Sequence, residues 1–224
     1  MPFQQLPLWI QLGAFMLALN AGMINVIGLI TLLHQSVSHM TGNASMLAIS
    51  IIQGDLSNII FLILVILSYV LGSSYSGFIL GNSHFQMGRR YGLPLSLMTA
   101  FIILSWYFIQ DYPRYGLLWA CAAMGIQNAM VSHYQGAIIR TTHLSGVLTD
   151  LGLALGYLFR GLHVEKKRII LHLLILFGFI LGGIIATGVY PYLKLNTFLM
   201  PVLLSFSLSC IYWFIYFRIH YLAK

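Results

Sequence analysis

The chain has 224 residues, of which 59% are hydrophobic and 7% are charged, and its mean hydropathy is +0.89. Soluble globular domains carry about 25% charged residues and disordered chains have low hydrophobicity, so both classes are excluded. The formal net charge of +7 comes mostly from basic residues at the ends of apolar segments, which favours lipid headgroups over nucleic acid as their partner.

Six apolar stretches are long enough to cross a hydrocarbon core of about 30 Å, which takes roughly 20 helical residues. In chain order they are 8–33, 57–81, 92–110, 115–139, 168–190 and 196–217. Two shorter stretches, 39–53 and 143–159, would reach only about 22 and 25 Å as helices. We therefore expect an all-α integral membrane protein with six transmembrane helices and two re-entrant or broken helices.

The distribution of loop charges supports six spans over eight. With eight spans, seven basic residues face four across the membrane, whereas six spans give a nine-to-two split that obeys the positive-inside rule better. The nine are Arg89, Arg90, Arg140, Arg160, Lys166, Lys167, Arg168, Arg218 and Lys224, against Arg114 and Lys194. This split predicts that both termini are cytoplasmic.

One polar motif occurs twice, as SHMTGNAS at 38–45 and THLSGVLT at 142–149. Two other pairs recur in the same order, GMIN with GIQN and GFILG with GFILG, and the three offsets are 103, 104 and 101 residues. The chain is thus expected to be one domain, 1–224, made of two repeats at about 8–110 and 115–217. Three spans in each repeat would insert the two halves in opposite directions, as in many transporters.

His39 and His143 are the sharpest candidates for function in these motifs. Ionisable side chains inside a membrane are expensive and mark pathways or relays, and imidazole can donate, accept or carry a proton. The alternative is structural, with each His holding the start of a short helix. Thr41 and Ser145 could similarly line a path or cap a helix start.

Asn25 and Asn128 lie deep in predicted spans, upstream of the two motifs, and we expect them to share the same site. Amides in membranes also hydrogen-bond between helices for stability alone. Arg140 and Asp150 occur only in the second half, where they could form a structural ion pair or take part in proton coupling.

The chain resembles the YoaK-like family of bacterial multi-pass membrane proteins, a domain of unknown function. The resemblance rests on NAGMIN at 20–25, SHMTGN at 38–43, GIQNA at 125–129 and RTTHLSGVLTD at 140–150. It implies a multi-pass protein of the bacterial inner membrane, and it supplies no activity.

We therefore expect a channel or secondary transporter for a small polar solute or ion. We expect neither a cofactor nor a resident metal, and the expected partners are the lipid bilayer and, as one possibility, further copies of the chain. The predicted path consists of Asn25, His39, Thr41, Asn128, Arg140, His143, Ser145 and Asp150. Two alternatives stay open. One is a membrane-embedded, metal-dependent enzyme acting on a lipid-like substrate, although no common enzyme motif is present, and the other is a structural or assembly protein.

Overall fold

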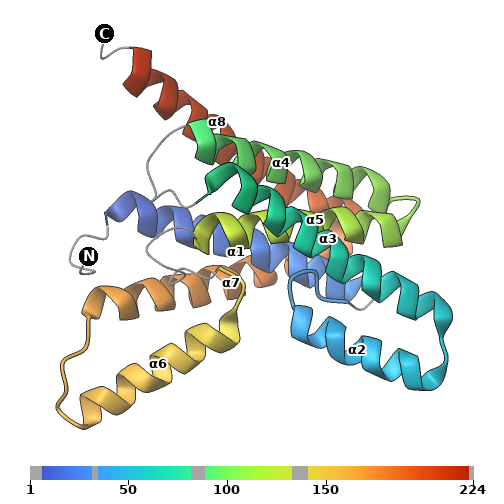
Figure 1. Ribbon diagram of the computed structural model, residues 1–224. Helices are drawn as coiled ribbons and strands as arrows, with labels where there is room; N and C mark the ends of the chain where they lie inside the picture. The colour runs from blue at the N-terminus through green and yellow to red at the C-terminus, as the bar shows by residue number, and fades with distance from the viewer. Residues whose placement is uncertain (1–6, 32–34, 82–88, 133–140, 222–224) are drawn as a thin grey trace.

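The computed structural model describes residues 7–31, 35–81, 89–132 and 141–221, and in this part of the chain it contains helices and turns but no strand (Figure 1). The all-helical prediction is confirmed for these residues. The helices are α1 (Leu8–Ile30), α2 (Met40–Gln53), α3 (Leu56–Leu80), α4 (Arg89–Ile109), α5 (Pro113–Ser132), α6 (Leu144–Phe159), α7 (Lys166–Leu193), the 3₁₀ turn η1 (Lys194–Phe198) and α8 (Leu199–Tyr221).

The six long predicted stretches correspond to α1, α3, α4, α5, α7 and α8, and the two short ones to α2 and α6. Among the described residues, four stretches are long and apolar enough to cross a membrane: 8–30, 56–80, 90–109 and 166–219, the last containing both α7 and α8. The α5 helix is not among the four because polar residues such as Gln127 and Asn128 lower its hydropathy. Its length of 20 residues corresponds to about 30 Å of helix.

The bundle is held by two helix pairs in which glycines let the backbones approach closely. The α1 helix packs along α7, and α3 packs along α5. At the four tightest positions a Cβ atom in place of the glycine hydrogen would overlap a carbonyl oxygen of the facing helix. The pairs are Gly22 with Phe179, Gly182 with Leu19, Gly72 with Ala122 and Gly125 with Tyr69. Small residues at helix interfaces are the usual basis of such packing in membranes.

The four glycine contacts form two equivalent pairs, related by one spacing on α1 and α5 and by another on α3 and α7. Gly22 and Gly125 are 103 residues apart, as are Leu19 and Ala122, whereas Gly72 and Gly182 are 110 apart, as are Tyr69 and Phe179. The two GFILG runs are offset by 101 residues and not by 110. They therefore do not align the residues of α3 and α7 that make equivalent packing contacts. Gly182 in the second copy lies against α1, while Gly77 and Gly81 in the first have no neighbour within 4 Å of a built Cβ.

The two short helices form hairpins with the long helices that follow them. Gly54 ends α2 and Gly161 follows α6, both with φ of +69°, a conformation that glycine adopts without strain. After the first turn, Asp55 accepts a hydrogen bond from the Asn58 backbone N–H at 3.1 Å and caps α3. In Figure 1 the α2–α3 and α6–α7 hairpins project from the bundle in opposite directions.

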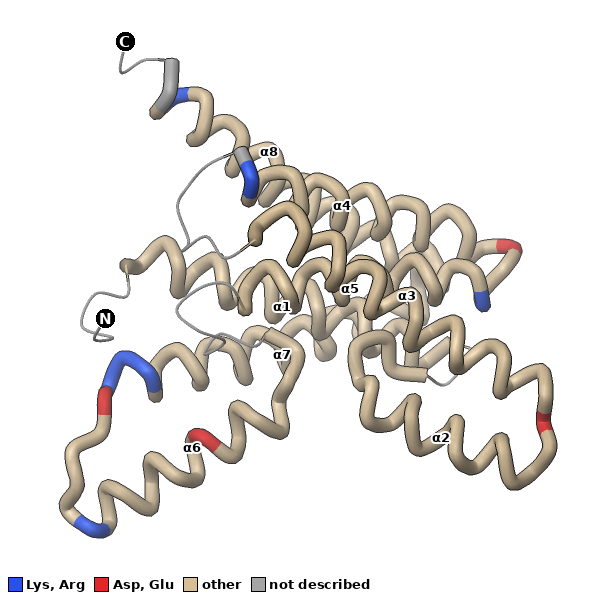
Figure 2. The backbone as a smooth tube through the Cα atoms, in the orientation of Figure 1, with Lys and Arg blue, Asp and Glu red and all other residues tan. Residues whose placement is uncertain are grey.

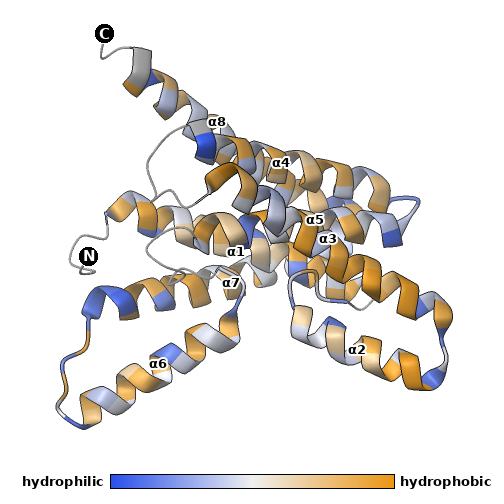
Figure 3. Ribbon diagram, viewed as in Figure 1, coloured by the Kyte–Doolittle hydropathy of each residue, from blue (hydrophilic) through white to orange (hydrophobic). Residues whose placement is uncertain are grey.

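Charged residues gather at the two ends of the molecule (Figure 2). The α6–α7 turn, the start of α4 and the end of α8 carry basic residues towards one end, and the α2–α3 and α4–α5 turns carry charges towards the other. Between them the outer faces of the long helices are apolar (Figure 3), with side chains such as Leu71 and Phe78 on α3 68% and 86% exposed. Such an apolar band between charged ends is what a lipid bilayer requires.

Candidate functional site

The two His motifs begin α2 and α6 in nearly the same backbone conformation. His39 has φ −88° and ψ 71°, His143 has φ −87° and ψ 66°, and each occupies the N-cap position without its side chain capping the helix. Instead, the His39 ring lies over Gly42, where a Cβ atom would approach the ring Nε2 to 3.1 Å. The glycine of the first motif thus makes room for the imidazole.

Asn25 holds the segment that leads into α2. Its Oδ1 accepts from the Ser36 hydroxyl at 2.7 Å and from the Ser38 N–H at 2.8 Å, and its Nδ2 donates to the Ala21 carbonyl at 2.8 Å and lies 2.9 Å from the Ser38 hydroxyl. The Asn43 amide adds a bond to the Ser36 carbonyl at 3.3 Å. An amide has two donors and two acceptor lone pairs, so these bonds use the full capacity of the buried Asn25 side chain.

Asn128 holds the segment that leads into α6 in a comparable way. Its Nδ2 donates to the Thr142 hydroxyl at 2.6 Å and to the Tyr69 hydroxyl at 2.8 Å, and its Oδ1 accepts from Thr141 at 3.4 Å. Gln127 donates to the Thr141 hydroxyl and to the Leu17 carbonyl of α1, both at 3.0 Å. Each asparagine thus anchors the chain 13 or 14 residues downstream, directly before the His of its motif.

Both anchored segments lie beside the central helices α1 and α5. The Cys121 thiol of α5 donates to the Val37 carbonyl at 3.3 Å, and the Val37 and Thr141 residues are fully buried. Beyond these segments, His39, Thr41, His143 and Ser145 are exposed on the surface of the protein. The structure therefore gathers the predicted site residues into two polar clusters, each at the start of a short helix, with α2 and α6 slanting away from each other (Figure 1).

Asp150 of α6 pairs with residues of the neighbouring helix α7. Its Oδ2 lies 3.1 Å from Arg168 Nη2 and 3.6 Å from Nε2 of the buried His172. The predicted partner Arg140 lies outside the described residues. An antiparallel hairpin that turns at 160–161 brings position 150 opposite position 170. Recognising this hairpin in the sequence would therefore have indicated Arg168 and His172 as neighbours of Asp150.

Two further polar residues of the core have surroundings that the sequence did not predict. Tyr69 of α3 has no signal in the sequence beyond a hydroxyl within an apolar helix, yet it binds Asn128. Asn20, the first residue of the NAGMIN run, is fully buried, and both atoms of its amide lack a hydrogen-bond partner among the described residues. Buried polar groups are rarely left unpaired, so Asn20 differs physically from Asn25.

Comparison with protein families finds a match to the family model described as "Protein of unknown function (DUF1275)", over residues 13–211. No curated protein and no solved structure matches the chain. In the part of the chain that the structure describes, no group of three or more His, Cys, Asp or Glu side chains is arranged to hold a metal ion.

Proposed function

The chain belongs to this family of unknown function, and we propose that it is a six-span protein of the bacterial inner membrane that passes a small polar solute or ion. In this proposal α1, α3, α4, α5, α7 and α8 cross the bilayer, α2 and α6 enter it from opposite sides, and both termini are cytoplasmic. The two halves then form an inverted repeat, the plan of many channels and transporters. This analogy is one of architecture and does not identify the solute.

The observation that carries the proposal is the placement of the two short helices. With 14 and 16 residues, α2 and α6 span about 21 and 24 Å, too little to cross a hydrocarbon core of about 30 Å. Both start beside the central helices and run towards opposite ends of the molecule (Figures 1 and 2). Irregular backbone at membrane depth is tolerated where it is buried in protein or lines a wet cavity, and here both segments before the helices are pinned by asparagines.

The helix starts favour a solute with negative charge or polar oxygen atoms. Backbone N–H groups at an N-terminus lack helical partners, and the helix dipole adds positive potential there. His39, Thr41, His143 and Ser145 supply the exposed polar side chains of the path. Asn25 and Asn128 act as anchors of these segments, and Asp150 with Arg168 fixes α6 on α7. Arg140 stays a prediction from the sequence.

We expect vesicles containing the full chain to take up at least one of three probes, chloride, formate or urea, faster than protein-free vesicles. The double variant His39→Ala, His143→Ala should slow this uptake at least about tenfold, because each hydrogen-bonding partner lost from the path costs roughly 1.4 kcal/mol. The matched control is His163→Ala in the exposed α6–α7 turn, which should leave uptake unchanged. Stopped-flow light scattering and ion-selective electrodes provide the readouts.

Uptake of all three probes at the protein-free rate would count against a solute path of this kind. Uptake that is unchanged in the double variant while its unfolding midpoint falls would instead assign the two His residues a structural role.

The topology has its own test. In a Cys210→Ser background, a cysteine at position 55 in the α2–α3 turn should react with a membrane-impermeant thiol reagent from the side opposite to the termini. A cysteine at position 163, in the α6–α7 turn, should react only from the side of the termini. The remaining thiol, Cys121, is fully buried. Labelling of both positions from the same side would rule out the inverted repeat, because α2 would then cross the membrane.

A further inference from the structure

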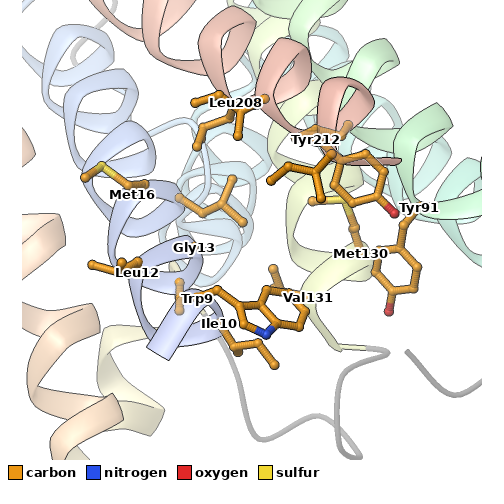
Figure 4. Close-up of a pocket in the computed structure, with 15 residues that line it drawn as sticks. Trp9, Ile10, Leu12, Gly13, Met16, Tyr91, Met130, Val131, Leu208 and Tyr212 are labelled. Carbon is orange, nitrogen blue, oxygen red and sulfur yellow. The ribbon is translucent and has the colours of Figure 1, made fainter. Parts of the chain in front are cut away.

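A cavity of about 640 Å³ lies between α1 and α8, near the start of α1 (Figure 4). Its volume falls within the range of roughly 300–1,000 Å³ that is typical of ligand pockets. The floor consists of buried residues of α1, α4 and α5, among them Ala14, Leu95 and Met130. The rim includes Leu12 of α1 and Ile211 of α8, which are 52% and 55% exposed, so the cavity opens on the outer face of the bundle.

The lining is almost entirely apolar. In Figure 4, Trp9, Leu12 and Met16 of α1 lie across from Leu208 and Tyr212 of α8. Such a lining gives a hydrated polar solute few partners, whereas it suits a hydrocarbon chain. Because the opening faces the region that lipid tails occupy in a membrane, an acyl chain can enter from the bilayer without passing through water.

A comparison of two glycines shows that the cavity is a local opening of helix packing. Gly116 of α5 lies so close to α4 that a Cβ atom would come within 2.7 Å of the Ile109 Cα and Cβ atoms. Gly13 of α1, 103 residues earlier, lines the cavity and has nothing within 4 Å of a built Cβ. Gly13 and Gly116 are 103 residues apart, the same spacing that relates Gly22 to Gly125, so they occupy equivalent positions on α1 and α5. At this position α4 packs tightly on α5, whereas α8 leaves a gap beside α1.

Two exposed arginines lie close in sequence to lining residues, one at the start of α4 and one near the end of α8. Arg90 directly precedes Tyr91, which lines the cavity, and Arg218 follows the lining residue Ile215 by one helical turn. The start of α4 and the end of α8 are held together there, since Gly92 lies against the Trp213 ring and Trp213 Nε1 donates to the Ser96 hydroxyl at 2.8 Å. Both arginines are exposed, and neither forms an ion pair with another described residue.

We propose that this cavity binds one anionic phospholipid of the surrounding bilayer, with an acyl chain between α1 and α8 and the phosphate beside Arg90 and Arg218. Moving an acyl chain from the bilayer into the cavity exchanges one apolar surface for another and gives little hydrophobic gain. Selectivity therefore comes from the headgroup. Two basic side chains near the membrane surface should favour an anionic over a zwitterionic lipid by roughly thirtyfold. The inference depends on membrane insertion and is independent of which solute the protein passes.

The test is native mass spectrometry of the purified full chain, delipidated and then titrated with phosphatidylglycerol and phosphatidylcholine that carry identical acyl chains. The wild-type chain should retain one tightly bound phosphatidylglycerol, with the preference given above. Gly13→Leu should fill the cavity and abolish this binding, whereas Gly77→Leu, also in open space but on α3, should retain it. Arg90→Gln with Arg218→Gln should bind both lipids equally, whereas Arg160→Gln should leave the preference unchanged.

Equal binding of both lipids by the wild-type chain would overturn the proposal, as would phosphatidylglycerol binding that Gly13→Leu leaves intact. A dimer that forms through α1 and α8 and is broken by Gly13→Leu would also overturn it, because a second copy would then occupy the cavity. If Gly13→Leu does not yield monodisperse protein, the arginine double variant decides alone, since its side chains lie outside the packed core.

Discussion

Replacing Gly22 by leucine should separate α1 from α7 and lower the free energy of unfolding by about 3 kcal/mol or more. Overpacking a core usually costs about 1–3 kcal/mol when neighbouring side chains can move aside. Here the obstacle is the Phe179 backbone carbonyl, which cannot rotate away without breaking the helix. Leucine is a better helix former than glycine, so helix propensity alone would predict that the substitution stabilises the protein. For a chain of this size we expect an unfolding midpoint lower by roughly 6–12 °C, or no monodisperse protein.

The matched control is Gly77→Leu on α3, where a Cβ atom has no neighbour within 4 Å and the change should stay within about 0.5 kcal/mol. Gly125→Leu should reproduce the effect of Gly22→Leu, because Gly125 faces the Tyr69 carbonyl in the same manner. Thermal unfolding in detergent, followed by size-exclusion chromatography, measures all three variants. A Gly22→Leu chain as stable as Gly77→Leu would mean that α1 and α7 do not pack as described.

Asn25→Leu should destabilise the protein by about 3 kcal/mol, whereas Asn20→Leu, five residues earlier on the same helix, should stabilise it by about 1–2 kcal/mol. Each buried group that loses its partner costs roughly 1–3 kcal/mol, and Asn25→Leu leaves the Ser38 N–H and two serine hydroxyls without theirs. The Asn20 amide has no hydrogen-bond partner among the described residues, so leucine removes only the penalty of a buried amide.

The comparison is sharp because both side chains are asparagine and both are at most 2% exposed. The free energy of unfolding in detergent, measured by denaturant titration, gives both values. Loss of stability in Asn20→Leu would show that its amide binds an internal water or a polar group that the described residues do not include. An Asn25→Leu chain of unchanged stability would contradict the anchoring role.

Much of the helix pattern followed from hydropathy and length. The short helices α2 and α6 begin one residue after the predicted positions 39 and 143, because the Ser/Thr-His-x-Ser/Thr-Gly motif interrupts apolar sequence with residues suited to a helix start. The six predicted spans correspond to only four stretches that hydropathy alone supports among the described residues. The polar residues that α5 buries in the protein lower its hydropathy, and α7 and α8 together form one continuous apolar stretch.

The roles of single polar residues were less accessible from the chain. Asn20 and Asn25 look alike in the sequence, yet only Asn25 meets the segment at Ser36 and Ser38. Asp150 pairs with Arg168 and His172 because the α6–α7 hairpin brings them together, and this register depends on where the turn at Gly161 falls. The repeated GFILG run was misleading, because Gly, Phe, Ile and Leu are common in any membrane helix.

By itself, the sequence determined which segments are helical, where the short helices begin and at which ends the charges gather, since these properties depend on local composition. Only the tertiary structure decided that α1 packs on α7 and α3 on α5, that asparagines anchor the segments before the His motifs, and that α8 leaves a cavity beside Gly13. The reason is that a helix facing lipid on one side and apolar protein on the other shows little amphipathic contrast. Its partners are then selected by close approach at glycines and by single buried hydrogen bonds between residues far apart in the chain.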